Sequence, residues 1–204
     1  PREAEKNTAG VAALRLLEKV GSDAGVELSI RKMMPLGSGL GSSAASGVAA
    51  AVAVNELLGR PLARGELLPC CMEAERIACG AAHADNAAPA LLGGFVLIRS
   101  YEPLDVVKIA SPDDLAAAVV HPHVEIRTED ARKVLRTRIT MKDAVTQWGN
   151  TAGLIAGLIT ADGAVDLRMH RSLALRELDG SAAAGPTSDL WHVQCQAARV
   201  KLAA

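Results

Sequence analysis

The sequence predicts an α+β protein whose helices and strands pack in two layers. Several segments carry apolar residues at the period of a helix, and short segments with a period of two lie between them. Their order lacks the regular spacing of repeated strand–helix–strand units, which argues against a doubly wound parallel sheet. Half of the 204 residues are hydrophobic and only 2% are aromatic. We therefore expect a folded chain with a thin, alanine-rich core.

The first half of the chain predicts a helix, a strand, a glycine-rich loop and a second helix. Residues 5–20 carry Leu and Val at helical spacing and end before a glycine, as an amphipathic helix does. Residues 26–33 alternate between apolar and polar side chains, which predicts a half-buried strand. Residues 44–58 are apolar on nearly every side and rich in alanine, the best helix former, so we expect a buried helix there.

The rest of the chain predicts further helices and strands. A helix over residues 64–79 contains Pro69, which is expected to kink its first turns or to mark where the regular part begins. Residues 80–94 have a polar, loop-like centre. The remaining expected elements are short strands over 95–99 and 105–109, a buried strand over 115–120, and helices over 128–136 and 141–160.

Charge and cysteine content argue against several classes of protein. The chain has 22 Lys and Arg against 23 Asp and Glu, so its net charge of -1 offers no field to attract nucleic acid or an anionic membrane surface. Its most apolar segments are too short to span a bilayer. The four cysteines form no C-x-x-C pair and no disulfide framework, so we expect no zinc site and a reducing compartment. The sequence thus predicts neither a nucleic-acid partner nor a membrane partner.

A glycine-rich segment before the alanine-rich helix is the strongest chemical signal. Gly37, Gly39 and Gly41 leave room for backbone N–H groups to turn toward one point, and Ser42 and Ser43 add hydroxyls at the start of a helix. With the positive end of the helix dipole, these groups suit the phosphates of a nucleotide. The spacing is neither a Walker A loop nor the dinucleotide-binding G-x-G-x-x-G. A flexible turn is the alternative, but the full string P-x-G-x-G-L-G-S-S-A favours a phosphate site.

This string closely resembles the second motif of the GHMP kinases, a family of small-molecule kinases. The resemblance implies that the loop wraps the phosphates of ATP and that the Ser43 hydroxyl helps to hold Mg²⁺. The residues of the ATP loop are then Pro35, Leu36, Gly37, Ser38, Gly39, Leu40, Gly41, Ser42, Ser43, Ala44, Ala45 and Ser46.

A second string, H-A-D-N-A-A-P-A-L-L-G-G-F beginning at His83, resembles the homoserine kinases of that family, most closely those of plants. The resemblance implies L-homoserine as the phosphate acceptor, with Asp85 and Asn86 serving its ammonium and hydroxyl groups. Arg132 matches the arginine that grips the carboxylate, and Thr128 lies one helical turn before it. The expected substrate-binding residues are His83, Asp85, Asn86, Thr128 and Arg132, and the expected catalytic residues are Asp85, Asn86 and Arg132.

Glu75 lies eight residues before His83, where the homoserine kinases carry an acidic Mg²⁺ ligand. Magnesium prefers hard oxygen ligands and keeps waters and phosphate oxygens around one or two carboxylates, so Glu75 and Ser43 would suffice as its protein ligands. Each residue of the two strings also has an ordinary explanation by itself, as a surface charge, a structural histidine or a turn residue. Their joint occurrence in the order of the family favours the site.

The resemblance implies a GHMP kinase fold with two domains. We expect an ATP-binding N-terminal domain over residues 1–100, of the ribosomal protein S5 domain 2-like type. A partial ferredoxin-like C-terminal domain is expected over 101–163 and a divergent tail over 164–204. The family's first strand and its N-L-G-P-G-F-D-like loop are not found, and the likeness is lost after about Gly163. The chain is therefore expected to be incomplete at its start and altered at its end.

The expected reaction transfers the γ-phosphoryl group of ATP to the side-chain hydroxyl of L-homoserine, which gives O-phospho-L-homoserine on the route to threonine. Two alternatives stay open: a catalytically inactive, truncated relative, and another GHMP kinase that acts on a mevalonate-type acceptor. The sequence also leaves a homodimer open. The plant-like resemblance implies the chloroplast stroma, and without it the cytoplasm is expected.

Overall fold

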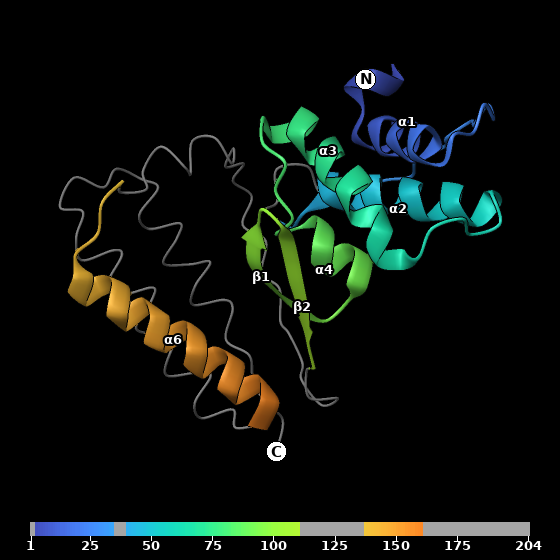
Figure 1. Ribbon diagram of the computed structural model, residues 1–204. Helices are drawn as coiled ribbons and strands as arrows, with labels where there is room; N and C mark the ends of the chain where they lie inside the picture. The colour runs from blue at the N-terminus through green and yellow to red at the C-terminus, as the bar shows by residue number, and fades with distance from the viewer. Residues whose placement is uncertain (1–2, 35–39, 111–136, 161–204) are drawn as a thin grey trace. The chain divides into compact units, whose positions relative to one another are not determined.

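The computed structural model describes residues 3–34, 40–110 and 137–160 (Figure 1). They fall into two compact units, which are described separately; the first holds the described residues up to Lys108, and the second holds helix α6. The elements in chain order are η1 (Ala4–Lys6), α1 (Thr8–Val20), α2 (Ser42–Leu57), η2 (Arg64–Leu67), α3 (Leu68–Cys79), α4 (Ala87–Leu92), β1 (Phe95–Tyr101), β2 (Leu104–Ile109) and α6 (Met141–Thr160). Helices together with a small sheet confirm the expected α+β class.

Helix α1 begins at Thr8 because Asn7 caps it. The Asn7 side chain accepts a hydrogen bond from the backbone N–H of Ala9 at 3.0 Å, which satisfies one of the donors that a helix start leaves open. The helix ends where Gly21 adopts the left-handed conformation with φ 64°. The helix predicted over 5–20 is therefore confirmed, with a short 3₁₀ turn before the cap.

Helix α2 is the buried centre of the first unit, and its small residues let its neighbours approach. A Cβ atom at Gly47 would lie 3.3 Å from the Ala74 Cβ of α3 and 3.5 Å from the Thr8 carbonyl oxygen of α1. Helices α1 and α3 therefore pack on α2 more closely than a larger side chain would permit. The helix predicted over 44–58 is confirmed, with its start two residues earlier at Ser42. Its burial is confirmed on one face only, because Ala49 and Ala53 are exposed.

The hydrophobic core of the first unit lies between α1, α2, α3 and α4. Its largest fully buried side chains are Leu16, Val54, Leu67, Cys71 and Leu91. Alanines fill much of the remaining space, as the composition predicts. Burial raises the pKa of the Cys71 thiol to about 12, so this cysteine stays protonated at neutral pH and packs as a small apolar side chain.

The segment at residues 26–33 corrects one prediction, because it forms no strand. Its alternation is visible in the burial: Val26 and Leu28 pack partly against the core, whereas Glu27 and Ser29 are exposed. A strand also needs partners for its backbone N–H and C=O groups, and none pairs with this segment within the described residues. The side-chain pattern therefore predicts correctly which residues face the core, but it does not provide a neighbouring strand for backbone hydrogen bonds.

Helix α3 follows the 3₁₀ turn η2, and Pro69 occupies its first turn. The missing N–H group of proline is harmless there, because the first N–H groups of a helix have no intrahelical partner. The expectation that Pro69 marks the start of the regular helix is confirmed.

Helix α4 lies in the second half of residues 80–94, a stretch for which the sequence predicts a loop-like centre and no helix. The Leu91 carbonyl accepts a hydrogen bond from Arg64 Nε at 2.7 Å, and the Leu92 carbonyl accepts one from Lys108 Nζ at 2.9 Å. These bonds satisfy carbonyls that a six-residue helix leaves open at its end. The helix thus depends on side chains distant in sequence, which local patterns do not reveal.

Strands β1 and β2 form a two-stranded sheet joined by a tight turn at residues 102–103. The short connection makes the strands antiparallel. Val96 and Ile98 of β1, with Leu104 and Val106 of β2, are partly buried against the core. Figure 1 shows the hairpin beside α4, and β1 contacts that helix. Both strands predicted in this region are confirmed.

Helix α6 confirms the prediction over 141–160. The Thr140 hydroxyl accepts the Asp143 backbone N–H at 3.1 Å and so caps the first turn. Several of its apolar side chains are exposed, among them Trp148 and Ile159.

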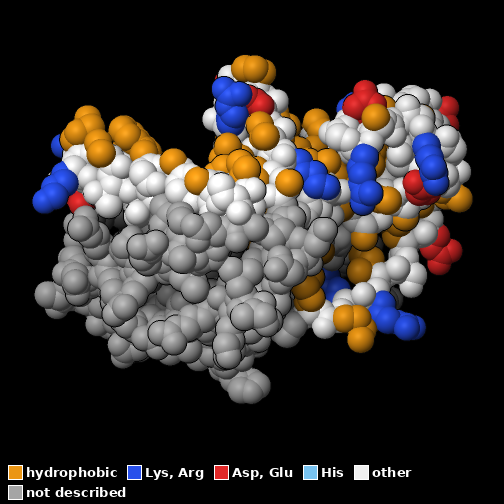
Figure 2. Space-filling view, turned by 90° about the horizontal axis from the view of Figure 1, so that it is seen from below, with side chains coloured by type: hydrophobic (Ala, Val, Ile, Leu, Met, Phe, Trp, Pro, Cys, Tyr) orange, Lys and Arg blue, Asp and Glu red, His pale blue; other side chains and the backbone are white. Residues whose placement is uncertain are grey.

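On the face of the molecule drawn in Figure 2, hydrophobic side chains lie among basic and acidic ones. Among the helices of the described ranges, none is both long and apolar enough to cross a membrane.

Two further predicted elements, the strand over 115–120 and the helix over 128–136, lie outside the described residues. The domain boundaries expected at residues 100 and 163 stay a prediction.

Replacing Leu16 by alanine tests the core. Leu16 is fully buried in α1, whereas Leu14 on the same helix is 41% exposed. We expect Leu16→Ala to lower the free energy of unfolding by about 2–5 kcal/mol, and Leu14→Ala by less than about 1 kcal/mol. Urea denaturation followed by circular dichroism measures both values. Equal effects of the two substitutions would contradict the packing of α1 described above.

Candidate functional site

The start of α2 holds the part of the glycine-rich loop that the structure describes. Residues 35–39 lie outside the described residues, so the loop is seen from Leu40 onward. Gly41 precedes α2 with a left-handed backbone at φ 69°, which glycine adopts without strain. The Thr8 hydroxyl at the start of α1 donates to the Ser43 carbonyl at 3.3 Å. Two helix N-termini therefore lie together here, each with the positive end of its dipole.

Glu75 is the buried acidic residue beside this helix end. It extends from α3 with 6% of its surface exposed and forms a side-chain hydrogen bond with Ser43. Burial raises the pKa of Glu75, and the nearby Asp85 carboxylate adds to the increase. The Ser43 hydrogen bond and the charge of His83 act in the opposite direction, toward a lower pKa. The structure thus brings together Ser43 and Glu75, the two residues that the resemblance assigns to Mg²⁺.

The HADN loop, residues 83–86, reaches the same place from the chain between α3 and α4. A Cβ atom built on Gly41 would lie 3.0 Å from the Asn86 Oδ1 atom, so Asn86 packs against the start of α2. The Asp85 carboxylate accepts the Asn86 backbone N–H at 3.0 Å. Ala84 is fully buried, whereas Asp85 and Asn86 are exposed. The loop is therefore anchored at Ala84 and presents two polar side chains beside α2.

Tyr101 belongs to this arrangement, although the sequence pattern does not predict it. Its hydroxyl accepts the Ala84 backbone N–H at 3.4 Å. Its ring meets the His83 ring edge to face, with centroids 6.5 Å apart. The sequence signal available for it is its place shortly after the HADN string, in the stretch that resembles the homoserine kinases. The end of β1 thus supports the loop.

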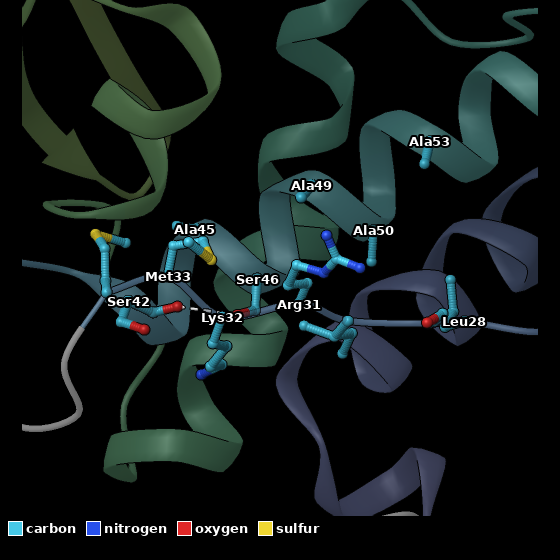
Figure 3. A pocket seen from close by; sticks show the side chains of 13 residues that line it. Leu28, Arg31, Lys32, Met33, Ser42, Ala45, Ser46, Ala49, Ala50 and Ala53 are labelled. Carbon is cyan, nitrogen blue, oxygen red and sulfur yellow. Dashed lines mark hydrogen bonds between the residues drawn. The ribbon is translucent and has the colours of Figure 1, made fainter.

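A groove runs along α2 from Ser42 at its start to Ala53 (Figure 3). It has a volume of about 410 Å³ and lies between α2 and residues 28–34. Its lining combines alanines of α2 with two basic residues, Arg31 and Lys32, and with Ser42 and Ser46 near the helix start. The Ser46 hydroxyl donates to the Ser42 carbonyl at 3.0 Å. The groove has the size of a small-molecule site and adjoins the glycine-rich loop.

The structure gathers these predicted site residues: Ser43, Glu75, His83, Asp85 and Asn86. Thr128 and Arg132 lie outside the described residues, as does the first part of the glycine-rich loop. In the part of the chain that the structure describes, no group of three or more His, Cys, Asp or Glu side chains is placed to hold a metal ion.

Comparison with known proteins shows which protein family this part of the chain resembles. Residues 7–94 match the family described as GHMP kinases N terminal domain. This stretch contains α1, the glycine-rich loop, α2, α3 and the HADN loop, which are the parts that meet at the start of α2. Residues 7–94 are therefore similar to the GHMP kinase N-terminal domain, and the expected GHMP kinase fold is confirmed.

Within that class, the chain is similar to homoserine kinases. A homoserine kinase of Chlorobium phaeobacteroides (strain BS1) is 53% identical over 168 residues, which cover 79% of this chain and 52% of that protein. One of Methanococcus maripaludis is 42% identical over 162 residues, which cover 79% of this chain and 53% of that protein. A crystal structure of homoserine kinase from Cytophaga hutchinsonii matches with a TM-score of 0.80 at 54% identity, covering 83% of this chain and 54% of that chain. The resemblance to homoserine kinases is confirmed.

The chain spans about half the length of the curated relatives it matches. The relatives named above come from bacteria and archaea and give no support to the plant-like detail of the resemblance or to a chloroplast location. The relation to homoserine kinases therefore stands without that detail.

Gly41→Ala tests the contact between α2 and the HADN loop. Gly21 is a matched control, because its backbone is also left-handed (φ +64° against +69°) but a Cβ atom there meets nothing within 4 Å. Both substitutions should lower the free energy of unfolding by about 1–2 kcal/mol through backbone strain. Gly41→Ala should lower it further, because its Cβ atom meets Asn86 Oδ1 at 3.0 Å. Urea titrations measure both, and equal losses would argue against the contact.

The buried Glu75 carboxyl predicts a pH dependence of stability. Its pKa in the folded protein lies above its ordinary value of 4.5, so above that pH the native state binds more protons than the unfolded chain. The contribution of Glu75 to the free energy of unfolding therefore falls as pH rises through this window. Glu75→Gln removes the titration, so the stability of this variant relative to the unaltered protein should increase as pH rises from about 4.5 to neutrality.

Urea unfolding of both proteins in EDTA, at several pH values, measures this difference. The comparison cancels the contribution of the other carboxyl groups. A difference that stays flat or falls with pH would contradict the raised pKa of Glu75.

Proposed function

We propose that the protein is a homoserine kinase, which transfers the γ-phosphoryl group of ATP to the side-chain hydroxyl of L-homoserine. One observation carries the proposal: the glycine-rich loop, Glu75 and the HADN loop converge at the start of α2. The chain in which they converge is 53% identical over 168 residues to a protein of that name. The product, O-phospho-L-homoserine, would serve threonine biosynthesis.

The proposed nucleotide site is the glycine-rich loop with the start of α2, residues 35–46. The first N–H groups of a helix have no intrahelical acceptor, and the positive end of the dipole favours phosphate oxygens. The groove of about 410 Å³ adjoins this helix start and offers room for the nucleoside part of ATP. Arg31 and Lys32 in its lining add positive charge that favours an anionic ligand.

Magnesium is the proposed metal cofactor, and Ser43 and Glu75 fit it chemically. Both offer hard oxygen atoms, and they are hydrogen-bonded to each other beside the start of α2. A cation would favour the ionised carboxylate and so oppose the effect of burial on the pKa of Glu75. When bound, the ion would neutralise charge on the β- and γ-phosphates. The protein itself would contribute two oxygen atoms, those of Ser43 and Glu75, beside the glycine-rich loop.

The proposed acceptor site combines the HADN loop with Thr128 and Arg132. Asp85 and Asn86 are exposed beside Gly41, where they can bind an ammonium group and orient a hydroxyl. Arg132 would bind the carboxylate of homoserine. In the transfer, the hydroxyl oxygen forms a bond to the γ-phosphorus while the bond from that phosphorus to the β–γ bridging oxygen breaks, so that ADP leaves with the bridging oxygen and the hydroxyl proton passes to water. Asp85 orients the hydroxyl in this scheme and is no obligate base.

The remaining expectations are proposals of the same kind. The cytoplasm is the proposed location, because the relatives named above are bacterial and archaeal. We also propose a division into two domains at residue 100 and a homodimer. Sedimentation equilibrium would measure whether the protein is a dimer.

An ADP-release assay of the purified 204-residue protein with ATP and Mg²⁺ tests the proposed function. We expect release that depends on L-homoserine and is absent when mevalonate replaces it. Release with mevalonate alone would identify another GHMP kinase activity. No release with either acceptor would identify a catalytically inactive relative, and both of these results would contradict the proposal.

The same assay with Asp85→Asn tests the role of Asp85. An orienting residue that keeps its hydrogen-bonding shape but loses its charge should lower kcat/KM for homoserine by about tenfold, whereas loss of an obligate base costs about 10²–10⁴-fold. Asp105→Asn is the control, because Asp105 lies on β2 in an ion pair with Arg99 at 3.0 Å. Unchanged kcat and KM in Asp85→Asn would exclude any role for this carboxylate.

A further inference from the structure

Tyr101, the last residue of β1, contacts the HADN loop in two ways. Its hydroxyl accepts the Ala84 backbone N–H at 3.4 Å. Its ring meets His83 edge to face, with centroids 6.5 Å apart and an interplanar angle of 79°. Because Ala84 is fully buried, the tyrosine hydroxyl supplies a partner for a backbone N–H that sits away from water.

The polar residues of the HADN loop come directly after Ala84, the residue that Tyr101 holds. Asp85 and Asn86 follow Ala84 in the chain and are exposed. The Asp85 carboxylate bonds to the Asn86 N–H, so this bond stiffens the loop without tying it to another element. A shift of Ala84 would therefore move both side chains relative to Gly41 and the start of α2.

We propose that Tyr101 is a positioning residue for the HADN loop. It acts through the Ala84 backbone and the His83 ring, and it fixes where Asp85 and Asn86 stand relative to the phosphate loop. A displacement on the scale of 1 Å at reacting groups lowers rates severely, so a side chain that fixes the loop affects the acceptor more than the nucleotide. The kinetic part of this inference rests on the proposed function, and the structural part does not.

Two variants and a control separate the contacts. Tyr101→Phe removes the hydroxyl and keeps the ring, whereas Tyr101→Leu removes both. Phe95→Leu is the matched control, because Phe95 lies six residues earlier on the same strand and therefore on the same side of it. The two aromatic residues are also similarly exposed, at 39% for Phe95 and 44% for Tyr101.

Amide hydrogen exchange at Ala84, measured by NMR, is a readout that needs no activity. We expect exchange about fivefold faster in Tyr101→Phe, at least as fast in Tyr101→Leu, and within about twofold of the unaltered protein in Phe95→Leu. The His83 ring resonances should shift in Tyr101→Leu and stay close to their positions in Tyr101→Phe, which keeps the ring contact. Unchanged exchange at Ala84 in both Tyr101 variants would overturn the proposal.

The ADP-release assay measures the kinetic consequence. We expect KM for homoserine to rise about three- to tenfold in Tyr101→Leu, while KM for ATP stays within about twofold. A merely structural role would change both KM values together with the melting temperature, and that result would overturn positioning. An active protein whose Tyr101 variants keep both KM values would overturn this inference alone. If the unaltered protein shows no homoserine-dependent release of ADP, that result would instead overturn the proposed function. Hydrogen exchange at Ala84 would still decide whether Tyr101 holds the loop.

Discussion

The close packing of α1 and α3 against α2 is the constraint on which the site depends. Gly47 permits it, because Ala74 and the Thr8 carbonyl lie where a larger side chain would stand. Glu75 follows Ala74 on α3, and Ser43 lies one helical turn before Gly47 on α2. The approach that brings Ala74 to Gly47 therefore also brings Glu75 to Ser43. A contact between small core residues thus sets the position of a buried carboxylate.

The polar end of α2 is stabilised differently from the core. Burying a carboxyl group is unfavourable, and the raised pKa of Glu75 reflects that penalty. The hydrogen bond with Ser43 and the positive ends of α1 and α2 offset part of it. A carboxyl group held in such a place lowers stability at neutral pH.

Local sequence patterns predicted the helices and strands whose own residues have the required periodicity or capping. They failed where the structure depends on residues distant in sequence. Helices α1, α2, α3 and α6 have their own periodicity or capping residues, and the hairpin has short β-prone runs. A strand over 26–33 was predicted from alternation, but pairing needs a neighbouring backbone. Helix α4 depends on Arg64 and Lys108 from elsewhere in the unit. Tyr101 escaped prediction because it acts through a backbone N–H, that of Ala84, which no residue type signals.

The packing at Gly47 brings the Ser43 and Glu75 side chains into contact. A double-mutant cycle between these two residues tests most directly whether they interact. Ser43→Ala, Glu75→Met and the double variant are compared with the unaltered protein by urea unfolding at neutral pH in EDTA. Methionine keeps the length of glutamate and removes its charge. We predict a coupling energy of about 0.5–3 kcal/mol between the two positions. Effects that add to within about 0.3 kcal/mol would mean that the two side chains do not interact, and would contradict the site as described.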